Sequence, residues 1–273
     1  MIHLGKCLSS GQVFRWREVE PGIWSGFDGT TPGRFDQRRV DFSPPPGAGN
    51  SFPNDLHWHR FFRLDEPLDL QSHLAEMCPK FATLARIEGF RLLRPSDPVE
   101  SFFSFLCTSN NHLSRIAKMV DFLFPAPDAE GSLAIPTFSE PELRAAGFGY
   151  RAATIPIAAQ RLIERGGQKY LLELRQATLN EARRELLSFP GVGPKLADCI
   201  ALYALHNTEA VPVDVHLWNG AVDLYFPEWR GTAVTASKYQ TIGDYFRNIF
   251  GPWAGHAHLF VYYGGILNRR RRG

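Results

Sequence analysis

Two residues that could take part in covalent chemistry, Lys195 and Asp214, bracket one apolar stretch of the chain. An uncharged lysine amine is a nucleophile that can form a Schiff base. Lys195 falls at the second position of a predicted helix, where the positive end of the helix dipole disfavours the ammonium form, and burial would add to this effect. We therefore expect an uncharged amine at position 195 facing the Asp214 carboxylate, which could stabilise developing positive charge. The structural alternatives are an exposed lysine and an aspartate that caps the next helix.

A glycine hairpin, residues 188–194, leads into this lysine and contains Gly191 and Gly193. Two glycines and two prolines cannot lie inside a helix, because they interrupt its hydrogen-bond ladder. Apolar residues recur at helical spacing from Tyr170 to Leu187 and again after the hairpin. The pattern predicts helix, tight turn, helix. Outward-facing amides at such a turn suit an anion such as a nucleic-acid phosphate, although a plain connector is the alternative.

The composition bounds the class of protein. With 273 residues, 44% hydrophobic and 13% aromatic, the chain is long enough for one large or two smaller globular domains. A net charge of +2 means that any site for a polyanion must be a local patch. The N-terminal residues have no signal-peptide core, and no apolar run is long enough to span a membrane. The cysteines lack the close spacing of metal or cluster ligands, which favours a reduced, cytosolic protein: Cys7, Cys78, Cys107 and Cys199.

The chain divides into two parts by pattern, residues 1–97 and residues 98–273. The first part has short alternating segments separated by glycine and proline turns, which predicts a small antiparallel sheet. The predicted strands are 12–16, 22–27 and 33–42. Two predicted helices follow them, 68–78 and 79–87. The second part is helical throughout. Its predicted helices include 99–107, 113–124, 140–146, 170–187, 194–204, a helix starting at 214, and 255–268. The fold class is therefore α+β.

Six motifs occur in order along nearly the whole chain: SGQVFRW (10–16), FLCTSNNHLSR (105–115), GFGYRA (147–152), PGVGPKLADC (190–199), VPVDVHLW (211–218) and GPWAGHAH (251–258). Together they resemble the 8-oxoguanine DNA glycosylase/lyases of the helix–hairpin–helix superfamily. The resemblance implies an N-terminal sheet domain like that of the TATA-binding protein, followed by a two-lobed, all-helical glycosylase domain. It also implies a bifunctional enzyme of base excision repair that removes 8-oxoguanine opposite cytosine from duplex DNA.

The resemblance assigns the catalytic roles to Lys195, as Schiff-base nucleophile, and to Asp214. It also implies residues that hold the DNA around a flipped nucleotide. Asn110 would enter the gap, Tyr150 would wedge beside the orphaned base, and the arginines would bind cytosine. Without the family, these would be a helix cap, a helix-start aromatic and surface arginines. The DNA-binding set is Asn110, Arg115, Tyr150, Arg151, Gly191, Gly193 and His216, the last at the 5′ phosphate.

By the same resemblance, four residues form the pocket for the damaged base. The Gly11 carbonyl would accept the N7–H that 8-oxoguanine has and guanine lacks. Cys199 and Tyr262 would stack on the two sides of the base, although core positions are their structural alternatives. His258 departs from the family, which commonly has glutamine at this position. Because an imidazole lacks the side-by-side donor and acceptor of an amide, reading of the guanine edge is altered or broadened.

Two other functions stay open at this point: excision of other oxidised or alkylated purines, and non-catalytic DNA binding through the hairpin. Many relatives carry closely spaced C-terminal cysteines for an iron–sulfur cluster, and nothing after Cys199 could supply them. We expect no cofactor and no side-chain metal site, although backbone carbonyls of the hairpin could hold an ion. The expected partner is double-stranded DNA with a damaged base, bound by a monomer. We expect a cytoplasmic location with the chromosome, or a nuclear one in a eukaryote.

Overall fold

The computed structural model describes residues 2–39, 55–67, 69–125 and 133–272. Near the N-terminus, the chain forms a three-stranded antiparallel sheet in the order β1 (Arg17–Glu20), β2 (Ile23–Asp28) and β3 (Thr31–Asp36). Gly26 pairs with Gly33 in the register of β2 and β3. A Cβ atom at these two positions would lie 2.8 Å and 2.5 Å from the Trp16 ring. The glycines therefore let Trp16 approach the sheet closely.

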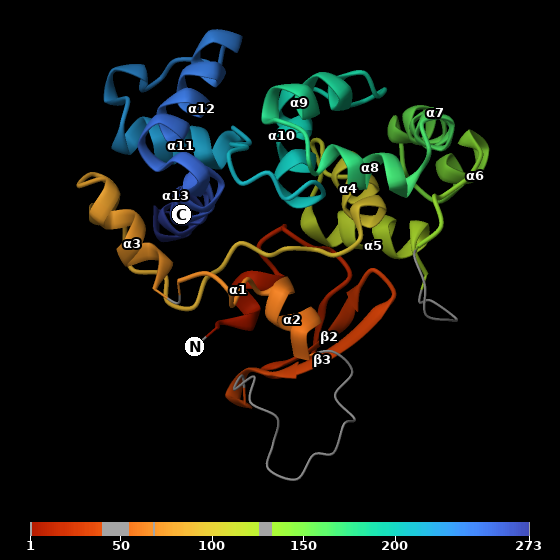
Figure 1. The fold of residues 1–273 in the computed structure, drawn as a ribbon, viewed down its shortest axis with the longest axis horizontal. Coiled ribbons are helices and arrows are strands. Elements are labelled where there is room, and N and C mark those ends of the chain that lie inside the picture. Colours follow the sequence, from red (N-terminus) through yellow and green to blue (C-terminus); the bar gives the residue numbers. More distant parts are fainter. Residues whose placement is uncertain (1, 40–54, 68, 126–132, 273) are drawn as a thin grey trace.

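The described helices from α4 onward form two groups, which lie side by side in Figure 1. The first group contains α4 (Pro98–Leu106), α5 (Leu113–Leu123), α6 (Glu140–Ala145), α7 (Arg151–Glu164), α8 (Gln168–Leu174), α9 (Leu179–Leu187) and α10 (Pro194–Tyr203). The second group contains α11 (Val215–Leu224), α12 (Ala236–Phe250) and α13 (Ala254–Arg272). This arrangement confirms the predicted α+β fold. Within the described ranges, no helix has both the length and the apolar character needed to cross a bilayer.

The N-terminal part of the chain also contains three short helices: α1 (Leu4–Leu8), α2 (Asp55–Phe61) and α3 (Leu70–Met77). Trp58 and Phe61 of α2 pack against Trp16, with ring centroids 5.7 Å and 5.9 Å away. In contrast, α3 lies against α12 and α13 of the second helical group (Figure 1). The division of the chain at residue 97 stays a prediction, since α3 comes from the N-terminal part.

The structure corrects three predicted elements. The single helix expected from Tyr170 to Leu187 is two helices, because Thr178 and Glu181 form a capping box that starts α9. Residues 79–87 contain only a 3-10 turn at Phe81–Thr83. Residues 12–16 form no strand. Instead, the side-chain amide of buried Gln12 donates to the Arg91 carbonyl at 3.0 Å and accepts from the Leu93 backbone amide at 2.9 Å.

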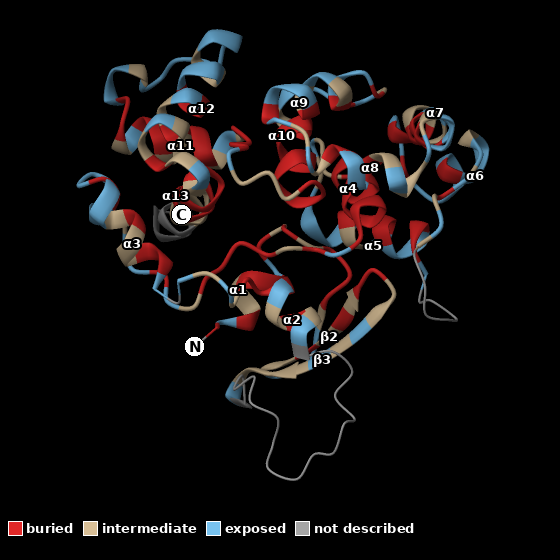
Figure 2. Cartoon of the chain, in the orientation of Figure 1, coloured by how far each residue is buried: buried red, intermediate tan, exposed pale blue. Residues whose placement is uncertain are grey.

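The core is centred on α4, in which every residue is buried (Figure 2). Asp97 caps this helix by accepting hydrogen bonds from the amides of Val99 and Glu100, at 2.8 Å and 2.9 Å. The Glu100 carboxylate also lies 3.0 Å from Arg15, which precedes β1. Breaking a buried pair of this kind leaves an uncompensated charge. The pair therefore fixes the N-terminal segment, with Gly11, against the helical part.

Candidate active site

A cavity of about 360 Å³ lies where the N-terminal segment, α5, α10, α11 and α13 meet. It brings together seven of the residues predicted from the sequence. They are Gly11, Lys195, Cys199, Asp214, His216, His258 and Tyr262. Volumes of this order are typical of small-molecule sites. The cavity therefore joins both predicted catalytic residues to all four residues predicted to bind the base.

One face of α10 forms a wall of the cavity. Gly193 caps the helix and Pro194 occupies its first turn, so Lys195 lies at the N-terminus. Cys199 and Tyr203 follow at intervals of four residues on the same face and also line the cavity. Sequence reasoning missed Tyr203, although its spacing from Lys195 could have indicated it. Its ring stacks on Phe105, with centroids 5.0 Å apart and planes 15° apart, so its position is fixed.

Asp214 is the N-cap of α11, as its structural alternative predicted. Its Oδ1 accepts hydrogen bonds from the amides of His216 and Leu217, at 2.9 Å and 2.8 Å. Both backbone bonds go to one oxygen, so among the described contacts Oδ2 is left for the cavity. The cap thus orients the carboxylate without using all of its capacity to accept.

The expectation of an uncharged amine at Lys195 is wrong for the protein without DNA. The pKa of Lys195 is raised, chiefly by Cys199 four residues along the helix, while burial opposes the effect and Asp214 adds to it. Burial raises the pKa of the Cys199 thiol to about 11, so at neutral pH this thiol acts on the amine as a neutral hydrogen-bond partner. Asp214 is then the anion that stabilises the ammonium. Lys195 must lose a proton before it can attack.

His258 and Tyr262 lie on α13 and face this cavity. Burial lowers the pKa of His258 to about 4, so its imidazole is neutral at neutral pH. Hydrogen bonds to the backbone of Gly255 and Pro212 partly offset burial and hold the ring in place. The rings of His258 and Tyr262 stack with centroids 6.0 Å apart, and the Tyr262 hydroxyl donates to the Ser10 carbonyl at 3.4 Å. The neutral imidazole is thus a fixed part of the cavity wall.

Gly11 and His216 occupy the rim of the cavity. Gly11 has φ +86°, and a Cβ there would lie 3.3 Å from Leu113 and 3.9 Å from the Tyr262 hydroxyl. Glycine thus suits both the backbone conformation and the close approach. The His216 ring meets Tyr262 edge-to-face at 5.6 Å, and within the described part of the chain its buried Nδ1 has no partner.

The four residues predicted to hold the flipped-out nucleotide do not line the cavity. Asn110 lies on the loop before α5, Arg115 lies in the first turn of α5, and Tyr150 and Arg151 lie at the start of α7. Asn110 is exposed and has φ +47°. Tyr150 is 58% exposed, and its hydroxyl donates to the Ser109 carbonyl at 2.9 Å. Arg151 donates to the same carbonyl and is buried, which excludes the alternative of a surface arginine. Arg115 donates to the Gly147 carbonyl at 2.7 Å.

The hairpin connects α9 to α10 as predicted. Gly191 is exposed with φ +81°, and a Cβ there would lie 3.3 Å from Thr154. Gly193 is also exposed, and a Cβ there would meet no atom within 4 Å. The carbonyls of Ser188 and Phe189 already accept hydrogen bonds, from Arg161 and from the hairpin itself. An ion held by hairpin carbonyls stays a prediction, and no chemical step depends on it.

Comparisons with known proteins give the family. No family model matches the chain. It is 34% identical over 282 residues to the N-glycosylase/DNA lyase OGG1 of Arabidopsis thaliana, a match that covers 93% of this chain and 74% of that protein. The chain belongs to the N-glycosylase/DNA lyase family. A member from Saccharomyces cerevisiae is 30% identical, over 78% of this chain and 66% of the relative.

The fold agrees with this family. A crystal structure of the Clostridium acetobutylicum 8-oxoguanine glycosylase/lyase, bound to duplex DNA with cytosine opposite the lesion, superposes with a TM-score of 0.75. It is 22% identical, and the match covers 98% of this chain and 93% of that one. In the described part of the N-glycosylase/DNA lyase chain, no group of three or more histidine, cysteine, aspartate or glutamate side chains could hold a metal ion.

We predict that replacing Asp214 with asparagine lowers the pH at which Lys195 forms a Schiff base with an abasic site. Asparagine caps helices as well as aspartate does, so α11 should persist. The substitution removes a charge that raises the pKa of Lys195, so the pH midpoint of trapping should fall. The measurement is borohydride trapping of a preformed abasic duplex as a function of pH. Asp223→Asn, an exposed change on the same helix, is the control, and an unchanged midpoint in Asp214→Asn would refute the electrostatic coupling.

The two hairpin glycines should respond differently to alanine. Gly191→Ala forces a side chain into a left-handed conformation beside Thr154 and should cost about 1–2 kcal/mol of unfolding free energy in urea denaturation. Gly193→Ala meets open space and should leave stability unchanged. If the hairpin amides bind phosphate, Gly193→Ala should still weaken duplex binding, because the new methyl group stands on the exposed side of the turn. Equal stability losses in both variants would contradict this difference.

Proposed function

We propose that this chain is a bifunctional DNA glycosylase and lyase that excises 8-oxoguanine opposite cytosine from duplex DNA in base excision repair. The observation that carries the proposal is the meeting of Lys195 and Asp214 in one cavity of a family member. A lysine nucleophile gives a covalent intermediate, and strand cleavage follows from that intermediate. Duplex DNA that contains a damaged base is the corresponding partner.

The proposed reaction begins with proton transfer, since Lys195 is charged before DNA binds. Once the amine is neutral, its nitrogen bonds to C1′ of the sugar, while the glycosidic bond breaks and the base leaves with the electron pair. The proton lost by the ammonium balances the proton that the departing base takes up. Asp214 stabilises the positive sugar, and its Oδ2 lies free among the described contacts to relay the proton.

The C1′–O4′ bond of the amine adduct then breaks, O4′ takes the electron pair and a proton, and a Schiff base joins Lys195 to the opened sugar. Strand cleavage uses this Schiff base. The iminium withdraws electrons from C2′, so a base can remove a proton there. The electron pair forms a double bond between C2′ and C3′, and the 3′ phosphate leaves with the electrons of its C3′–O bond. Hydrolysis of the iminium then regenerates Lys195. This sequence accounts for both base release and nicking by one amine.

Recognition of the opposite base is assigned to the loops around Ser109. Flipping a nucleotide costs a few kcal/mol, and the gap must then be filled. We propose that Asn110 fills it, that Tyr150 wedges beside the orphan, and that Arg115 and Arg151 donate to the O2 and N3 atoms of cytosine. Without DNA, each arginine donates to one backbone carbonyl, and the remaining N–H groups of its guanidinium are the ones proposed to reach cytosine.

The damaged base is proposed to lie between Cys199 and Tyr262, with the Gly11 carbonyl accepting its N7–H. His216 would contact the 5′ phosphate, and the amides of the hairpin at Gly191 and Gly193 would contact the DNA backbone. The neutral His258 offers one ring nitrogen at a time to the base edge, instead of an amide pair. This observation favours a second candidate function, the excision of related oxidised purines such as formamidopyrimidine lesions.

Several broader features belong to the same proposal. The protein acts as a monomer and needs no cofactor, and an ion at the hairpin is optional to the reaction. It works where the chromosome lies, in the cytoplasm or, in a eukaryote, in the nucleus. Residues 1–97 supply the Gly11 side of the base pocket, and residues 98–273 supply the catalytic pair.

The decisive experiment uses four duplexes with 8-oxoguanine opposite each of the four bases, scored separately for base loss and nicking. We expect preference for cytosine, nicking by β-elimination and a borohydride-trapped adduct. Lys195→Gln should abolish both trapping and nicking, because the variant has no amine. Duplex binding without base release in the unchanged protein would instead support non-catalytic binding. Base release without a trapped adduct would indicate a glycosylase that activates water.

Replacing His258 with glutamine should sharpen lesion preference. A side-by-side amide pair adds a bidentate contact of about 1–3 kcal/mol with a base edge. The ratio of 8-oxoguanine excision to excision of the adenine-derived formamidopyrimidine, which lacks the guanine edge, should therefore rise by about tenfold. The control is trapping on a preformed abasic duplex, which contains no base to read and should not change. A lower or unchanged ratio, with trapping intact, would show that position 258 does not read the base edge.

A further inference from the structure

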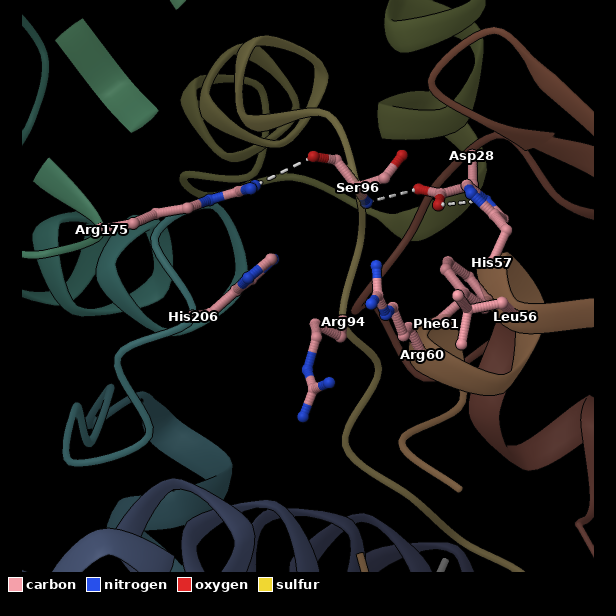
Figure 3. A pocket seen from close by; sticks show the side chains of 9 residues that line it. All are labelled: Asp28, Leu56, His57, Arg60, Phe61, Arg94, Ser96, Arg175 and His206. Atoms are coloured by element: carbon pink, nitrogen blue, oxygen red, sulfur yellow. Dashed lines mark hydrogen bonds and ion pairs between the residues drawn. The ribbon is translucent and has the colours of Figure 1, made fainter. Parts of the chain in front are cut away.

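A second cavity, of about 430 Å³, lies between the sheet and the first helical group (Figure 3). Of the described residues, none lines both this cavity and the candidate active site. Its lining is rich in cationic and imidazole side chains. The residues are Asp28, Leu56, His57, Arg60, Phe61, Arg94, Ser96, Arg175 and His206. They come from β2, from α2, from the segment before α4, and from the ends of α8 and α10.

Two of the three arginines in this cavity contact no carboxylate among the described residues. Arg60 is exposed, and its guanidinium makes no hydrogen bond or ion pair with the described part of the chain. Arg175 donates to the carbonyls of Ala204 and Ser96, at 2.9 Å and 3.0 Å. These contacts orient the Arg175 guanidinium but leave its charge without a counterion in contact. Arg94, in contrast, pairs with acidic residues outside the cavity.

The acidic group in the lining is already engaged. Asp28 accepts a hydrogen bond from the Ser96 amide at 2.9 Å and lies 2.9 Å from His57 Nε2. It is buried, at 3% exposure, so it does not reach across the cavity to Arg60. Figure 3 shows Arg175 and His206 on one side of the pocket, and Arg60 with His57 on the other. The cavity thus presents two guanidinium groups from opposite walls that no carboxylate contacts among the described residues, and Asp97 and Asp28 act on Arg175 only from a distance.

His206 lies just after the last turn of α10 and lines the cavity. Its backbone has φ +59°, a left-handed conformation that commonly ends a helix, and the Asn207 amide donates to the Ala201 carbonyl at 2.9 Å. Its Nε2 donates to the Pro95 carbonyl at 2.7 Å, which leaves Nδ1 without a proton in the neutral ring. Burial, and then the charge of Arg175, lower the pKa of His206 to about 3. A bound anion would offset this positive field.

We infer that this cavity is a phosphate-binding site that links the sheet to the helical part through Arg60 and Arg175. Phosphate oxygens match the fork of an arginine guanidinium, and charge-assisted hydrogen bonds of this type are strong. Phe61 is fully buried, so the wall offers no exposed aromatic ring for a base to stack on. The recognised chemistry is therefore the phosphate itself, carried by a free phosphate compound or by a nucleic-acid strand. The inference does not depend on glycosylase chemistry.

The test titrates the full chain with inorganic pyrophosphate at constant ionic strength. We expect saturable binding by calorimetry, together with a rise in the pKa of the His206 ring by NMR. Arg60→Gln should weaken binding by about tenfold, since one charge-assisted contact is lost. Because Arg60 is exposed and unpaired among the described residues, this variant should fold normally. Arg184→Gln is the matched control, since Arg184 is exposed on α9 and does not line the cavity.

A second arm identifies the source of the phosphate. Binding of long undamaged duplex DNA is compared between Arg60→Gln and the unchanged protein across salt concentrations. Weaker binding and a shallower salt dependence would assign the phosphate to a DNA strand. Unchanged duplex affinity, with pyrophosphate binding lost, would assign it to a free phosphate compound. The inference is overturned if pyrophosphate does not bind saturably, or if Arg184→Gln weakens its binding as much as Arg60→Gln does.

Discussion

The capping of α11 by Asp214 is the interaction on which the candidate active site depends. One carboxylate oxygen satisfies two amides at the helix start, which fixes the direction of the other. The preceding residues Val211 and Val213 are buried, so the segment that carries the aspartate is held from the core side. On the facing helix, the hairpin and Pro194 place Lys195 in the first turn. The reactive pair is thus set by two helix N-termini rather than by flexible loops.

Much of the helical part could be predicted from sequence, because periodic apolar residues and caps are local signals. The hairpin, α4, α5 and the Asp214 cap all follow from such patterns. The division between α8 and α9 was equally local, since Thr178 and Glu181 form a recognisable capping box. Residues 12–16 were harder to interpret, because their alternating polar and apolar residues resemble a strand. The partners of the Gln12 side chain, Arg91 and Leu93, are distant in sequence and give no local signal.

The electrostatics of the site could not be predicted from spacing alone. A lysine at a helix N-terminus suggests a lowered pKa, yet Cys199, four residues along the same helix, and Asp214, brought in by the fold, reverse the direction. The burial of Arg151 and its hydrogen bond to the Ser109 carbonyl likewise depend on how the Asn110 loop packs against α7. Arg115 and Arg151 each donate to a backbone carbonyl, and these contacts orient the two guanidinium groups.

Burial of the thiols lowers their reactivity with oxidants. Desolvation raises the pKa of Cys7 and Cys107 to about 12 and that of Cys199 to about 11. Peroxides attack the thiolate form of cysteine, and that form is scarce in all three residues at neutral pH. The protein thus keeps a sulfur atom beside Lys195 without offering that atom to peroxides as a thiolate.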